Sequence, residues 1–197
     1  MIRSFSKTFD RLMQLPLGLH AGLAVLSFAA FQGVQIALNA SYAASRFPVD
    51  YKTGQLAFSG ETLEGYYAVM QDAGTLGVYL RTQVIDYGFI LGTAVVGMVL
   101  ASLVARLALR RGPVRIGAMI VAALAVLGAG FDAAENLVSF VLLANPNDIA
   151  EPLALLYSAL AAAKFACLMP ATTLFFVVLA AGLIARGHAL LRQTRLG

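Results

Sequence analysis

The sequence predicts an all-α membrane protein, a bundle of four transmembrane helices. Hydrophobic residues make up 60% of the 197 residues and charged residues only 12%, which departs from the composition of soluble domains. A helix needs about 20 mostly apolar residues to cross a bilayer. Four stretches reach that length: 17–40, 84–105, 116–144 and 153–185. Because they take more than half of the chain, we expect one integral membrane domain over 1–197.

The first fifteen residues have the pattern of an N-terminal amphipathic helix. Apolar and basic side chains recur on opposite sides at helical spacing: Ile2, Phe5, Phe9, Leu12 and Met13 against Arg3, Lys7 and Arg11. We expect this helix to lie in the headgroup region with its aromatic side toward the lipid. It is interpreted as an interfacial anchor, and recruitment to a particular anionic lipid is the alternative.

The first span is apolar until its outer end, where Gln32, Gln35 and Asn39 form one polar stripe. Amide side chains in membrane helices hydrogen-bond across to neighbouring helices. This stripe therefore predicts contact with a second helix, or the lining of a cavity mouth. Gln32 and Gln35 are candidate binding residues.

Residues 41–80 form the sizeable loop on the outer side. Its second half predicts an amphipathic helix that begins near Glu61, with Ser59 as N-cap, and rests on the outer face before the second span. Gly74 and Gly77 are the positions where this helix is expected to bend into that span. Three tyrosines suit an aromatic belt at the membrane surface: Tyr66, Tyr67 and Tyr79.

The third and fourth spans carry ionisable side chains at membrane depth, where each costs about 2.5–3.5 kcal/mol on insertion scales. Asp132, Glu135 and Asn136 are three and four residues apart, so they share one helix face. Lys164 lies at a similar depth on the next, antiparallel helix. We therefore predict a contact between Lys164 and the two acids.

Asp86 lies just inside the outer end of the second span, five residues after Arg81. Asp86 is nearer the outer surface than the acids of the third span, and it is expected to reach them through Arg81 or water. Asp86, Arg81 and Asn136 are further candidate binding residues.

Two roles for the charged residues stay open. One is a buried ion pair that sets the register of the bundle. The other is chemical, with Asp132, Glu135 and Lys164 as catalytic candidates: a carboxyl acts as acid or base while the lysine holds an anionic group. Such residues also suit a proton pathway.

The chain lacks the residues that several classes of function require. His20 and His188 are read as isolated interfacial histidines, and two histidines make a poor metal or haem site. A single cysteine, Cys167, excludes an intrachain disulfide and Cys-x-x-Cys redox chemistry. The chain has no Gly-rich phosphate loop, and its basic residues are not interleaved with aromatics as in nucleic-acid binding. We expect no metal, no cofactor and no nucleic-acid partner.

The basic residues predict the orientation, because short basic loops stay cytoplasmic. Ten of the 14 flank span ends on one side: Arg3, Lys7, Arg11, Arg106, Arg110, Arg111, Arg115, Arg186, Arg192 and Arg195. Both termini are therefore expected in the cytoplasm, and the Ala/Leu/Arg-rich usage favours a bacterial inner membrane.

The sequence favours a membrane binding or assembly protein that contacts membrane lipids and a membrane protein partner or a second copy of itself. A lipid- or isoprenoid-handling enzyme with an intramembrane carboxylate as acid or base is the first alternative. A proton- or ion-coupled transport subunit is the second. Whether the protein is an enzyme is left open.

Overall fold

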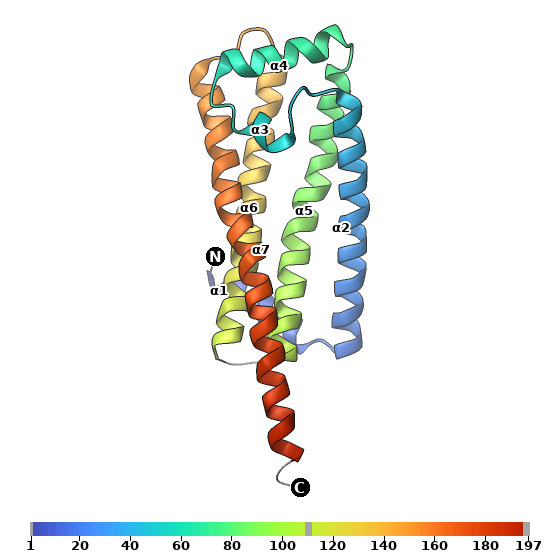
Figure 1. Cartoon of the computed structure of the whole chain (residues 1–197), viewed down its shortest axis with the longest axis vertical. Helices are drawn as coiled ribbons and strands as arrows, with labels where there is room; N and C mark the ends of the chain where they lie inside the picture. Colours follow the sequence, from blue (N-terminus) through green and yellow to red (C-terminus); the bar gives the residue numbers. More distant parts are fainter. Residues whose placement is uncertain (1, 109–111, 195–197) are drawn as a thin grey trace. The chain divides into compact units, whose positions relative to one another are not determined.

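The computed structural model describes residues 2–108 and 112–194, and this part of the chain is helical without strands (Figure 1). Its helices in chain order are α1 (Ile2–Gln14), α2 (Leu17–Ser45), α3 (Tyr51–Gln55), α4 (Gly60–Asp72), α5 (Leu76–Leu107), α6 (Pro113–Ala144) and α7 (Glu151–Thr194). Four of them, α2, α5, α6 and α7, are long and apolar enough to cross a membrane. This confirms the predicted fold class and indicates a multi-pass membrane protein.

The four long helices extend beyond the predicted spans. α2 continues to Ser45, α5 begins at Leu76, and α7 runs through Pro170 to Thr194. Hydropathy finds only the apolar part of a helix, whereas turns and caps set its ends. The break between α4 and α5 lies at Gly74, whose φ of +66° suits glycine, as predicted for one of the two bend positions.

The chain packs as two compact units, and each takes a segment from every long helix. Unit 1 comprises Met1–Ala29, Thr93–Leu127 and Cys167–Gly197, and it contains α1. Unit 2 comprises Ala30–Gly92 and Gly128–Ala166, and it contains α3 and α4. Of the basic residues used to predict orientation, Arg110, Arg111 and Arg195 lie outside the described residues.

In unit 1, the apolar side of α1 packs against protein and not against lipid, which corrects the expectation for this helix. Phe9 is 0% exposed and Met13 is buried as well. Both belong to a core with small residues of α5 and α6, namely Ala101, Ala105, Ala118 and Ala122. Alanines leave room for a third helix to approach closely. The Asp10 carboxylate pairs with Arg115 of α6 at 2.7 Å and holds α1 in this position.

In unit 2, α4 begins where the sequence predicts, and Ser59 caps it by accepting a hydrogen bond from the Thr62 N–H at 3.3 Å. Figure 1 shows α4 running across the ends of the long-helix segments of this unit, with α3 beneath it. Two hydrogen bonds tie α4 to the start of α7. The Gly60 N–H donates to Glu151 Oε2 at 2.8 Å, and the Ile149 N–H donates to Glu64 Oε1 at 2.7 Å.

Two of the tyrosines expected in an aromatic belt at the membrane surface are buried inside unit 2. Tyr67 and Tyr79 are buried in a core under α4, together with Leu63, Met70, Leu142 and Tyr157. The belt interpretation is therefore wrong for these two residues. Because α4 is tied to the start of α7, its apolar stripe faces protein.

Helix α3 is absent from the sequence prediction, because five residues carry no readable periodicity. Asp50 starts it as N-cap and accepts the Thr53 N–H at 3.0 Å. Hydrogen bonds from the Thr53 side chain and backbone lower the pKa of Asp50 from its ordinary value. α3 therefore begins at a titratable cap on the exposed side of unit 2.

Candidate functional site: a polar cluster inside unit 2

Lys164 of α7 pairs with two acids of α6 in the interior of unit 2. Its Nζ donates to Asp132 Oδ1 at 2.7 Å and also pairs with the Glu135 carboxylate. Glu135 is 0% exposed, and both Asp132 and Lys164 are 3% exposed. The next residue after Asn136, Leu137, is 62% exposed, so α6 turns one polar face inward and an apolar face outward. The predicted contact between the third and fourth spans is confirmed.

Asp86 of α5 lies with the acids of α6 in the interior of unit 2, but Arg81 does not hold it there. Its Oδ2 accepts hydrogen bonds from Asn136 Nδ2 at 2.8 Å and from the Tyr51 hydroxyl at 3.1 Å. Arg81 is exposed, because a step of five residues turns it well away from Asp86 on the helix. Asp86 is therefore held next to the acids of α6 by Asn136, the residue after Glu135, and not by Arg81.

The polar residues extend further along α5 and α6. Gln83 is 1% exposed, and its Nε2 donates to Ser139 Oγ at 2.7 Å. Ser139 follows Asn136 on the inward face of α6 and is fully buried. We call the whole group the polar cluster: Tyr51, Gln83, Asp86, Asp132, Glu135, Asn136, Ser139 and Lys164.

Like Gln83, Tyr51 is a member of the polar cluster that sequence reasoning missed. Its hydroxyl bonds Asp86, and the centre of its ring lies 5.7 Å from Lys164 Nζ, within range of a cation–π contact. Phe165 faces the same ammonium at 5.3 Å. Burial, followed by the charges of Asp86 and other neighbours, raises the pKa of Tyr51 well above its ordinary value. The Tyr51 hydroxyl therefore stays protonated at physiological pH and donates its hydrogen bond to Asp86.

The polar cluster holds more hydrogen-bond acceptors than donors. Three carboxyl groups, those of Asp86, Asp132 and Glu135, surround one cation, Lys164. Three buried oxygens of the polar cluster have neither a hydrogen bond nor an ion pair among the described residues: Gln83 Oε1, Glu135 Oε1 and Asn136 Oδ1. A buried acceptor without a partner costs about 1–3 kcal/mol. The cluster therefore favours an added proton, or a group that donates hydrogen bonds.

The remaining candidate binding residues lie apart from the polar cluster. Gln32 is exposed and Gln35 is half-buried on α2, and Arg81 is exposed on α5. The structure records no hydrogen bond or ion pair from these three side chains to the cluster. A binding role for them stays a prediction.

The histidine reading also changes in unit 1. His20 is fully buried, and its Nε2 lies 3.1 Å from Ser102 Oγ and 3.3 Å from the Val99 carbonyl oxygen. It is therefore a packed histidine, where we expected an interfacial one. Within residues 2–108 and 112–194, no group of three or more His, Cys, Asp or Glu side chains is placed to hold a metal ion.

Comparison with protein-family models, with curated proteins and with solved structures finds no match to this chain. The polar cluster is the feature of unit 2 with the potential for chemistry. It brings acids, a lysine and a phenol into hydrogen-bonding range at membrane depth, an arrangement that suits the holding and exchange of protons.

Proposed function

We propose that this protein is a membrane binding protein whose polar cluster takes up and releases protons within the bilayer. The charge imbalance carries the proposal. With Asp86, Asp132 and Glu135 all ionised, Lys164 would compensate only one of three buried charges. An uncompensated carboxylate in an apolar interior is so unfavourable that the group takes up a proton instead. The cluster is therefore expected to hold at least one proton at neutral pH.

The hydrogen bonds supply a route for that proton. Lys164 contacts both Asp132 and Glu135, so a proton can be exchanged between two acids that share one ammonium. Asn136, the residue after Glu135 on α6, holds Asp86 beside this group with a hydrogen bond but is not itself a proton carrier. Glu135 Oε1 has no partner among the described residues and is the acceptor best placed to receive the proton.

A hydrogen bond also links the protonation state of Asp86 to the short helix α3. Asp86 accepts from Tyr51, which belongs to α3. Protonating Asp86 weakens it as an acceptor, because charge-assisted hydrogen bonds are about twice as strong as neutral ones. Uptake of a proton at Asp86 is therefore expected to loosen α3. Through this coupling, the protonation state of the cluster would change how firmly α3 is held.

Two other readings fit less well. An assembly protein with a purely structural ion pair calls for a closed, fully paired cluster, and the three unpartnered oxygens argue against it. A lipid- or isoprenoid-handling enzyme calls for a substrate next to Glu135 or Asp132, whose carboxylates are already engaged with Lys164. The transport alternative shares the proton chemistry and differs in requiring flux.

We further propose a bacterial inner membrane location with both termini in the cytoplasm. The distribution of Lys and Arg over the span ends supports this orientation.

Infrared spectroscopy of the full-length protein in lipid tests the proposal, because a protonated carboxyl has a carbonyl band that a carboxylate lacks. At neutral pH we expect this band in the wild type and its reduction in Asp86→Asn, Asp132→Asn or Glu135→Gln. Asp72→Asn is the matched control, since Asp72 is exposed on α4. A folded wild type without the band, or equal bands in every variant, would contradict proton binding.

A further inference from the structure

Unit 1 contains a second feature that the polar cluster does not explain. A cavity of about 390 Å³ lies among α2, α5 and α7, within the size range of ligand sites. Apolar side chains line part of it, including Leu17, Leu107, Leu179 and Leu183. Two cations, Arg106 and Arg186, also line it, and no acidic side chain is among its described lining residues.

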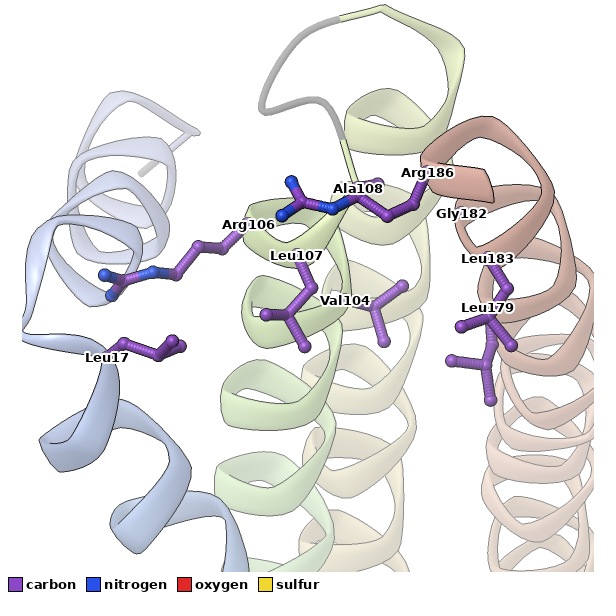
Figure 2. Close-up of a pocket in the computed structure, with 9 residues that line it drawn as sticks. All are labelled: Leu17, Val104, Arg106, Leu107, Ala108, Leu179, Gly182, Leu183 and Arg186. Atoms are coloured by element: carbon purple, nitrogen blue, oxygen red, sulfur yellow. The ribbon is translucent and has the colours of Figure 1, made fainter. Parts of the chain in front are cut away.

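The charged and apolar parts of this cavity are separated. Figure 2 shows the guanidinium groups of Arg106 and Arg186 along one side, with the side chains of Leu17, Leu107, Leu179 and Leu183 on the other. This arrangement suits a ligand that has an anionic head and an apolar body. A soluble anion would leave the leucines unused, and a neutral apolar ligand would leave two guanidinium groups unpaired.

The cavity lies where the candidate spans end. Leu17 is the first residue of the α2 span, Leu107 is the last of the α5 span, and Arg186 lies two residues before the end of the α7 span at His188. Span ends lie at the level of lipid headgroups. Basic pockets between transmembrane helices at that level suit phosphate headgroups.

Arg106 is already held in place for such a contact. It donates a hydrogen bond to the Leu15 carbonyl in the connection between α1 and α2. A guanidinium has five N–H donors in a rigid fork, so Arg106 retains donors for a ligand. A phosphate accepts such a fork with two parallel hydrogen bonds. Arg186 is exposed and supplies the second charge.

We propose that this cavity binds an anionic phospholipid, with the phosphate on Arg106 and Arg186 and the start of an acyl chain against the leucines. The described lining has two arginines and no acidic residue, so it repels a headgroup ammonium. It therefore favours a headgroup with net negative charge, such as phosphatidylglycerol, over one that carries its own ammonium, such as phosphatidylcholine. The site is independent of proton exchange in the polar cluster of unit 2.

Native mass spectrometry of the full-length protein, with phosphatidylglycerol or phosphatidylcholine of equal chain length, tests the site. We expect the wild type to retain one phosphatidylglycerol in preference to phosphatidylcholine. Arg186→Gln should weaken that retention about fivefold, the effect of one basic residue near a membrane surface. Arg81→Gln is the matched control, because Arg81 is an exposed arginine of unit 2 and should leave retention unchanged.

A second variant tests the apolar part without changing charge. Gly182 is buried and lines the cavity, so Gly182→Leu should fill it and release the lipid from a protein that still elutes as a folded species. Equal retention of both lipids, no effect of Arg186→Gln, or no effect of Gly182→Leu in folded protein would overturn the proposal. Displacement of the lipid by glycerol phosphate at equal concentration would do so too, because the site would then recognise phosphate alone.

Discussion

The Tyr51 hydroxyl donates a hydrogen bond to Asp86 Oδ2 across 3.1 Å, and so joins the short helix α3 to the buried polar cluster. Asp86 is 1% exposed, whereas α3 begins at an exposed cap. One side chain therefore connects a surface segment to acids at membrane depth.

Tyr51→Phe removes this connection and keeps the ring. Hydrogen bonds of this kind in membrane proteins contribute about 0.6 kcal/mol on average. We expect a small loss of stability, together with faster amide hydrogen exchange in α3. Tyr66→Phe is the control, because Tyr66 packs on Phe47 and lies outside the polar cluster. Exchange in α3 that is equal in both variants would show that Tyr51 does not hold the helix.

The ionisation of Tyr51 gives a prediction at high pH. Burial raises its folded-state pKa well above the ordinary value, which is about 10 in an unfolded chain. The stability that follows from this difference is complete below pH 10 and is lost as the pH rises toward the folded pKa. Difference absorbance between the wild type and Tyr51→Phe should therefore show no tyrosinate from Tyr51 at pH 10. Half-ionisation of Tyr51 at that pH would contradict its burial.

Asp50 gives the opposite prediction at low pH. Its folded-state pKa is lowered by the hydrogen bonds from Thr53, so its contribution to α3 is present above the unfolded value of about 3.9 and is lost as the pH falls through the folded pKa. Asp50→Asn keeps an N-cap acceptor and removes the titration. Hydrogen exchange of α3 should then accelerate in acid for the wild type only. The same acid dependence in both proteins would exclude Asp50 as its source.

Lys164→Met should destabilise the protein by about 3–5 kcal/mol, the effect of breaking a buried ion pair on one side. Asp132 and Glu135 would both lose their cation. Adding Glu135→Gln to Lys164→Met should recover part of the loss, because it removes one unpaired acid. Thermal midpoints in one detergent measure all three proteins, with Lys7→Met as the exposed control. A double variant less stable than Lys164→Met would contradict this explanation.

Phe9→Ala tests whether α1 is part of the bundle. Removing a fully buried phenylalanine should cost about 3–5 kcal/mol. Phe28 is the matched position, since it lies on α2 with 47% of its surface exposed, and Phe28→Ala should cost far less. Similar melting temperatures for the two variants would mean that Phe9 faces lipid.

Periodicity explains why the centre of the site was predictable from sequence. Asp132, Glu135 and Asn136 share a face at any helix rotation, and the short turn before α7 fixes Lys164 at a similar depth. The same logic placed α4 after Ser59. These features depend on spacing along one helix or across one short turn.

Other features depend on contacts that spacing does not contain. Tyr51 lies on a five-residue helix, so no repeat identifies it. The amphipathic stripe of α1 predicts that Phe9 packs in an apolar environment. It does not distinguish lipid from the alanines of α5 and α6. Arg106 and Arg186 read as topology signals in sequence, and only the fold places them around one cavity.

The protonation of the polar cluster is measured most directly by NMR of the full-length protein in lipid bilayers, with ¹³C-labelled Asp and Glu carboxyls assigned by Asp86→Asn, Asp132→Asn and Glu135→Gln. Carboxyl carbon shifts distinguish the acid from the carboxylate. Proton binding predicts at least one of these three residues in the acid form at pH 7, and release of that proton at higher pH while the protein stays folded. Three carboxylates at pH 7 would contradict it.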